Sequence, residues 1–213
     1  MKKRNIEITL ETAKEWYNSN IVLKDIALQA FSEEELKYNF KDIKTFEDAC
    51  KVLNICYKDV NLIIASITMY SKASAAMFKL NIIRKALNLG QDLHLTKDPE
   101  HSNLYYPRNH FITNNCTYYE GELNTNKFGI IGRIKYKGEV FKVLNNCSYT
   151  SSNIGLGCFN FGLGIGYANT NFGFLGCASE EIAQHFSKYF GMLITEAKYS
   201  DLPDFQIIER KYE

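Results

Sequence analysis

The stretch that decides the fold of the C-terminal half is residues 129–144, which read GIIGRIKYKGEVFKVL. Apolar and polar side chains alternate through much of it, and a period of two is typical of β-strands. We therefore expect strands over Gly129–Tyr136 and Val140–Leu144, separated by the loop Lys137-Gly138-Glu139, which suits a β-hairpin. A further strand is expected over Asn109–Thr113.

The expected hairpin carries a row of basic side chains. Arg133, Lys135 and Lys137 are two residues apart and so project from one face, whereas Ile134 and Tyr136 project from the other. Such a row is typical of a solvated face, which is the favoured interpretation, or of a charged edge that discourages aggregation. The row also suits phosphate groups. In that alternative Arg133, Lys135, Tyr136 and Lys137 form a phosphate-binding site.

From Val143 to Ser179 the chain has no Asp, Glu, Lys, Arg or His. Much of this segment alternates glycine or asparagine with apolar and aromatic residues, which predicts further strands. Two interpretations stay open: a central sheet covered by a helix over residues 180–197, or a face that packs against another subunit. The candidate interface residues of the second interpretation are Phe159, Phe161, Tyr167, Phe172 and Phe174.

The first 90 residues are expected to be helical. Thr9 suits the N-cap of a first helix, which continues through Trp16. Two capping boxes follow, one starting at Ser32 and one at Thr45, and each places a carboxylate three residues after the cap. Short helices should therefore begin at both positions.

Longer helices are expected before and after the sheet. Between residues 59 and 89, apolar residues such as Ile63 and Ile64 recur at intervals of three and four, which predicts one long helix, or two joined near Ser71. Ser179 suits the N-cap of a last helix with an apolar stripe. The expected fold class is α+β: an N-terminal helical part, then a small antiparallel sheet covered by a C-terminal helix.

Glycine and proline divide the chain into two regions. All three prolines and every glycine except Gly90 lie beyond residue 90. This change of composition predicts a boundary near residues 90–105. We expect a helical domain over residues 1–90 and a domain of antiparallel sheet plus C-terminal helix over residues 105–213.

Composition excludes several classes of protein. With 25 basic and 24 acidic side chains among 213 residues, the net charge is +1, so binding to nucleic acid is not expected. The N-terminus lacks the apolar core of a signal peptide, and no stretch is apolar enough to predict a spanning helix, so we expect no membrane partner. The six scattered cysteines are expected to be reduced thiols that act as small buried hydrophobes.

The sequence offers no catalytic constellation. His94, His101, His110 and His185 do not show the close spacing of metal ligands, so neither a metal nor another cofactor is expected. The run GLGIG at residues 162–166 does not open a helix, as a dinucleotide fingerprint requires. We therefore expect a protein that is not an enzyme, with a dispersed Cys-His site as the minor alternative.

Four stretches of the chain resemble a group of known proteins. They are ITLETAKEWYN at residues 8–18, LKDIALQAFSEEEL at residues 23–36, FEDACKVL at residues 46–53 and EIAQHFSKYF at residues 181–190. They resemble uncharacterised proteins encoded by phages and prophages of gut Bacteroidetes, including crAss-like phages. The last stretch follows an aromatic and glycine-rich segment, as it does in those proteins.

The resemblance implies a function but carries no catalytic motif. It implies a structural protein of the virion, in the head or the tail, made in the host cytoplasm. Its expected partners are other copies of itself, as a homo-oligomer, and other virion proteins. The alternative is a phage accessory protein that acts inside the infected cell by binding a phosphate-bearing small molecule or a host factor.

Overall fold

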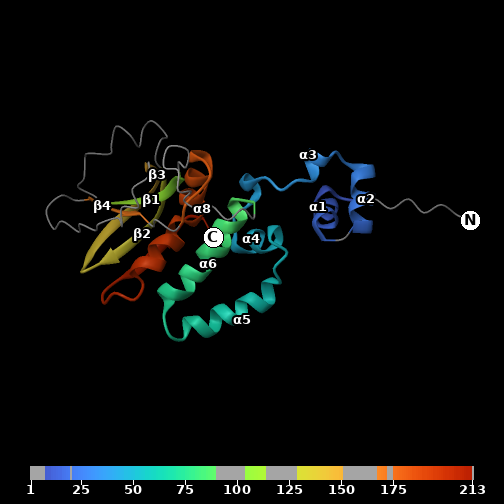
Figure 1. The fold of residues 1–213 in the computed structure, drawn as a ribbon. Helices are drawn as coiled ribbons and strands as arrows, with labels where there is room; N and C mark the ends of the chain where they lie inside the picture. Colours follow the sequence, from blue (N-terminus) through green and yellow to red (C-terminus); the bar gives the residue numbers. More distant parts are fainter. Residues whose placement is uncertain are drawn as a thin grey trace, which may run out of the picture.

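The computed structural model describes residues 8–19, 21–89, 104–113, 129–150, 167–171 and 175–212, and its fold is α+β (Figure 1). The helices are α1 (Leu10–Ser19), α2 (Ile21–Ala30), α3 (Glu33–Leu36), the 3-10 helix η1 (Phe40–Asp42), α4 (Phe46–Val52), α5 (Tyr57–Thr68), α6 (Lys72–Leu87) and α8 (Glu180–Tyr199). The strands are β1 (Leu104–Thr113), β2 (Ile130–Tyr136), β3 (Glu139–Thr150), β4 (Tyr167–Asn171) and β5 (Gln206–Arg210).

The described strands form one antiparallel sheet in the order β4-β1-β3-β2-β5. The expected hairpin is confirmed, but its loop is one residue shorter than predicted, because Glu139 already pairs with Tyr136. The two loop residues, Lys137 and Gly138, have φ values of 49° and 86°. Two successive positive φ angles are typical of a two-residue hairpin turn whose twist matches that of the strands.

The C-terminal helix α8 covers one face of the sheet, as expected (Figure 1). The helix begins where the sequence predicts, since the Ser179 hydroxyl accepts a hydrogen bond from the backbone N–H of Ile182 at 3.3 Å. The buried residues between the sheet and this helix are Phe111, Ile131, Ile134, Val143, Met192 and Tyr199. This apolar layer fixes the helix against β1, β2 and β3.

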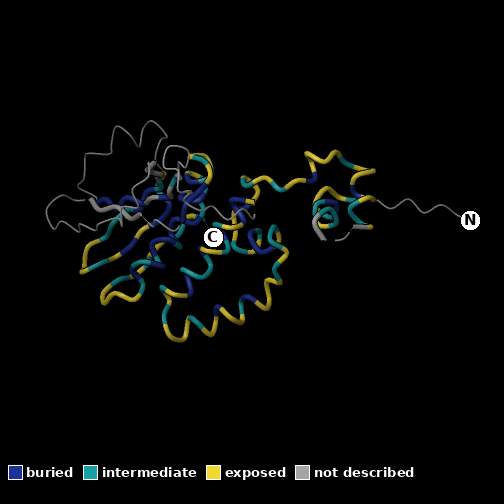
Figure 2. Tube along the Cα trace, in the orientation of Figure 1, coloured by how far each residue is buried: buried dark blue, intermediate teal, exposed yellow. Residues whose placement is uncertain are grey.

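A second helical layer packs against α8 on the side away from the sheet. Leu80 and Ile83 of α6 share a core with Phe186 and Phe190 of α8, and Figure 2 shows buried residues gathered along both helices. The expected boundary near residues 90–105 falls mostly outside the described residues, so the two-domain division stays a prediction. The α6–α8 contact nevertheless shows that the helical region and the sheet region share one core.

The helical stretch after residue 57 consists of two helices. The Ser71 hydroxyl accepts a hydrogen bond from the backbone N–H of Ser74 at 2.9 Å, and so caps the start of α6. The turn Met69–Tyr70 separates this cap from the end of α5. Of the two alternatives, the pair joined near Ser71 is therefore the observed one.

The first three helices pack around a small core of their own, set apart from the sheet in Figure 1. Ala13, Ala27 and Leu36 are its buried members. Both predicted capping boxes are confirmed. The Ser32 and Thr45 hydroxyls accept hydrogen bonds from the backbone N–H groups of Glu35 and Asp48, respectively. The carboxylates of Glu35 and Asp48 accept the backbone N–H groups of the two cap residues in return.

Candidate functional site

A groove of about 530 Å³ lies between η1 and α8 and is the candidate functional site. Its size falls within the range usual for small-molecule sites. The residues that line it are Phe40, Lys41, Lys44, Asn145, Glu181, Gln184, His185, Lys188 and Tyr189. We call it the α8 groove. Three ammonium groups, one carboxylate and three rings thus meet in one hollow.

One face of α8 supplies most of the lining. Its residues in the groove occupy positions i, i+3, i+4, i+7 and i+8 of the helix, which align on one face: Glu181, Gln184, His185, Lys188 and Tyr189. The opposite face of the helix carries the buried apolar residues that contact the sheet and α6. The amphipathic pattern of α8 therefore turns this polar and aromatic row toward the groove.

His185 connects α8 to the chain that follows η1. Its Nε2 lies 2.7 Å from the carbonyl oxygen of Ile43, and because a carbonyl only accepts, Nε2 carries the proton. Its ring stands edge-on to Phe40, with centroids 5.6 Å apart, and lies 4.6 Å from that of Tyr189. Burial lowers the pKa of His185 more than the hydrogen bond to Ile43 raises it, and nearby lysines lower it further, so the neutral ring prevails at pH 7.

The lysines of the groove differ in their partners. Lys41 approaches the carboxylate of Glu181 at 3.8 Å, and both side chains are mostly exposed. Lys44 and Lys188 have no carboxylate partner among the described residues; instead their ammonium groups lie 5.9 and 5.1 Å from the centre of the Tyr189 ring. The Lys188 ammonium also lies 5.8 Å from the centre of the Tyr212 ring. The groove therefore carries net positive charge.

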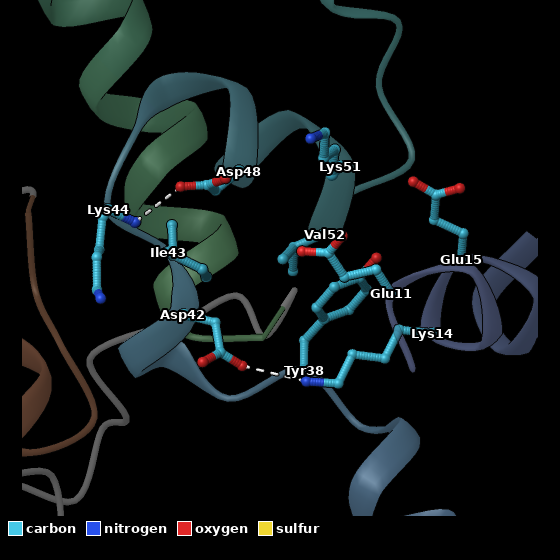
Figure 3. Close-up of a pocket in the computed structure, with 10 residues that line it drawn as sticks. All are labelled: Glu11, Lys14, Glu15, Tyr38, Asp42, Ile43, Lys44, Asp48, Lys51 and Val52. Atoms are coloured by element: carbon cyan, nitrogen blue, oxygen red, sulfur yellow. Dashed lines mark hydrogen bonds and ion pairs between the residues drawn. The ribbon is translucent and has the colours of Figure 1, made fainter. Parts of the chain in front are cut away.

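A second hollow, of about 380 Å³, lies between α1 and the chain from Tyr38 to Val52 (Figure 3). Its lining carries four carboxylates and three ammonium groups, and the Lys44 side chain lines both this hollow and the α8 groove. Two of its carboxylates are engaged: Lys14 pairs with Asp42 at 3.3 Å, and the Asp48 carboxylate accepts backbone N–H groups in its capping box. This hollow joins the N-terminal helices to the rest of the chain. Its contacts favour a structural role over ligand binding.

The predicted phosphate row lies elsewhere, on the sheet face away from α8. Arg133 and Lys135 are exposed there while Ile134 is buried, so the predicted alternation is confirmed for these residues. Lys137 departs from the prediction: it lies in the hairpin turn, with its ammonium 5.3 Å from the centre of the Tyr136 ring. Arg133 pairs with Glu209 of β5 at 3.1 Å, and neither hollow described above includes this row.

The structure describes one of the five predicted interface residues, Tyr167. Phe159, Phe161, Phe172 and Phe174 lie outside the described residues. Tyr167 begins β4, where its backbone is paired with that of Ile112. The interface therefore stays a prediction.

The cysteine prediction is confirmed at two positions and wrong at a third. Cys50 and Cys177 are buried in the core, whereas Cys56 is exposed. Cys56 occupies the N-cap of α5, a position outside the buried face of that helix. His94 and His101 lie outside the described residues, among which no group of three metal-ligating side chains occurs.

The structure also reveals an exposed apolar surface that the sequence did not predict. Its members, on α5 and the turn after it, are Leu62, Ile63, Met69 and Tyr70, with exposed fractions of 71%, 51%, 84% and 91%. We call it the α5 surface. Ile63 follows the helical period of the core residues, but among the described residues α5 packs through Val60, Ile64 and Ile67.

Neither the α8 groove nor the α5 surface could be recognised from sequence. The groove needs η1 and α8, which are more than a hundred residues apart, to meet. The polar residues Glu181, His185 and Lys188, spaced by four and three positions on one helix face, were its single local signal. Among the described helices, none is both long enough and apolar enough to span a membrane.

Comparison with models of known protein families, with curated proteins and with solved structures found no match for the chain.

Proposed function

We propose that this chain is a non-enzymatic docking protein of a phage particle, a head or tail component that oligomerises or attaches to other virion proteins. The observation that carries the proposal is the α5 surface. Met69 and Tyr70 expose 84% and 91% of their area, and large apolar side chains grouped on a surface are typical of protein interfaces.

The turn that carries Met69 and Tyr70 is followed by residues that are hydrogen-bonded to Asp201. The Ser71 hydroxyl donates to the Asp201 carboxylate at 2.6 Å, and the backbone N–H of Ala73 donates to the same carboxylate at 3.3 Å. Asp201 follows α8, so the turn is tied to the main helix of the core. A turn fixed before its partner arrives loses less conformational entropy on binding.

The place of action belongs to the same proposal. The resemblance of residues 8–18, 23–36, 46–53 and 181–190 to phage proteins supports a virion location after synthesis in the host cytoplasm. The partners proposed are a second copy of the chain and other virion proteins. The uncharged aromatic segment that includes Phe159 and Phe161 remains a second proposed contact.

The test combines particle composition with oligomeric state. Mass spectrometry of purified particles should detect the chain, and the double variant Met69→Ser/Tyr70→Ser should lower its copy number per particle. The matched control is Ile208→Ser, which also replaces an exposed apolar residue, at 50% exposure, but on the edge strand β5. Absence of the chain from particles, together with a monomer by light scattering at high concentration, would overturn the proposal.

The alternative function, binding of a phosphate-bearing molecule or host factor inside the infected cell, has weaker support at the hairpin. Glu209 already pairs with Arg133, and Lys137 lies in the turn beside Tyr136 rather than in the row. The variant Arg133→Gln tests it: a phosphate-dependent rise in melting temperature that disappears in this variant would favour the alternative.

A further inference from the structure

We propose that the α8 groove binds a small phosphorylated aromatic molecule of the size of a nucleoside monophosphate, with Lys44 and Lys188 on the phosphate and the Tyr189 and Phe40 rings beside the aromatic part. The proposal concerns a different site from the α5 surface and from the hairpin row. Tests of the docking function therefore neither support nor contradict this proposal.

The charge of the groove favours an anion. Lys44 and Lys188 reach it from opposite sides, one from the chain after η1 and the other from α8, and among the described residues no carboxylate pairs with either. The carboxylate in the lining, Glu181, lies at the Lys41 side, where it forms a long and exposed ion pair. A phosphate between Lys44 and Lys188 would accept charge-assisted hydrogen bonds from both ammonium groups.

The present contacts of these two lysines are weak and exchangeable. Both ammonium groups lie 5 to 6 Å from the centre of the Tyr189 ring, an arrangement that contributes little at an exposed site. The Tyr189 ring also belongs to an aromatic cluster, since its centroid lies 4.6 Å from that of His185 and 5.2 Å from that of Tyr212. In the proposed complex a phosphate draws the ammonium groups away and the aromatic part of the ligand packs against this cluster, so one molecule that carries both groups satisfies both halves of the groove.

The walls of the groove are already in position. The hydrogen bond from His185 to the Ile43 carbonyl ties α8 to the chain after η1, and the edge-on contact of Phe40 with the His185 ring fixes the aromatic wall. The backbone N–H groups of Lys44 and Thr45 are held by the Asp48 carboxylate. A site whose backbone does not need to reorganise binds a small ligand at lower entropic cost.

The size and charge of the groove favour a small molecule over a nucleic acid. Its volume of about 530 Å³ suits a single nucleotide unit. A nucleic-acid site is usually a longer basic stripe, whereas here basic residues flank one hollow of a chain with net charge +1.

Isothermal titration calorimetry with AMP tests the proposal on the full chain. We expect saturable binding, and the double variant Lys44→Gln/Lys188→Gln should weaken it by about tenfold or more. The control is Lys58→Gln/Lys85→Gln, which removes the same charge from two exposed lysines of α5 and α6 and should leave binding unchanged. Equal melting temperatures of the two double variants would show that the loss does not come from unfolding.

Three further ligands separate the contributions. Adenosine, which lacks the phosphate, and inorganic phosphate, which lacks the ring, should each bind at least about tenfold more weakly than AMP. Absence of AMP binding at concentrations up to about 10 mM would overturn the proposal, as would equal weakening in the control variant. Tighter binding of a single-stranded oligonucleotide than of AMP would overturn it as well, because the site would then be part of a nucleic-acid surface.

Discussion

Asn109 of β1 donates a hydrogen bond from its side chain to the backbone carbonyl of Gly191, at the middle of α8. The same amide donates to the Thr195 hydroxyl at 2.9 Å and accepts from the Ser187 hydroxyl at 3.3 Å. All three side chains are fully buried. A polar network thus fixes where the helix crosses the sheet, and it needs a close approach that glycine permits.

Replacing Gly191 by alanine should lower the free energy of unfolding by about 1–3 kcal/mol, even though alanine favours helix. The added methyl group would collide with the Ile131 side chain and lie 2.8 Å from the Asn109 side-chain oxygen. Urea denaturation measures the change. The control Gly129→Ala, where the new atom meets only the Asn145 side-chain oxygen at 3.1 Å, should have a smaller effect. An unchanged midpoint for Gly191→Ala would contradict this packing.

Replacing Lys137 by asparagine should stabilise the hairpin by about 0.5–1 kcal/mol. Lys137 has a φ of 49°, a region that asparagine tolerates better than lysine, and Asn-Gly is the preferred pair for this turn. Thermal unfolding followed by circular dichroism measures the gain. A lower melting temperature would show that the contact of the Lys137 ammonium with the Tyr136 ring contributes more than the backbone strain costs.

The Asp201 anchor predicts a pH dependence. Its hydrogen bonds, first of all from Ser71, lower the pKa of Asp201 below the ordinary value of 3.8, so the unfolded state takes up this proton first as the pH falls. The stability that Asp201 contributes is therefore complete above pH 3.8 and decreases as the pH falls below it. The difference in unfolding free energy between the wild type and Asp201→Ala, followed by urea denaturation, should shrink over that range. A difference independent of pH would refute the anchor.

His185 predicts a second pH effect, in a higher window. Burial lowers its pKa below 6.5, so the unfolded state binds the proton more readily, and stability should fall as the pH drops from 6.5 toward the folded pKa. An NMR titration should place the midpoint of His185 below 6.5, with its signal assigned from the variant His185→Gln. A midpoint at or above 6.5 would mean that the ring is not desolvated in the groove.

Local signals in the sequence predicted much of the fold. Hydroxyl caps at Ser32, Thr45 and Ser179 act within three residues, so these helix starts follow from the chain itself. The hairpin is local too. Its loop length was predicted one residue too long because Glu139, a polar residue beside glycine, suits a loop as well as a strand end.

The non-local features could not be predicted in the same way. The order β4-β1-β3-β2-β5 depends on which strand edges meet. The groove depends on Lys44 and Tyr189 coming together from distant parts of the chain. Ile63 is 51% exposed although it follows the helical period. Helical periodicity alone does not show whether an apolar residue faces the core or the surface.

The docking function is tested most directly by photo-cross-linking at Tyr70 within purified particles. A benzophenone side chain replaces Tyr70 in one preparation and Ile208 in another, since both residues are exposed, one in the turn after α5 and the other on β5. The docking proposal predicts a cross-link from position 70 to a virion protein or to a second copy of the chain, and none from position 208. Particles that contain the chain but give no cross-link from position 70 would contradict it.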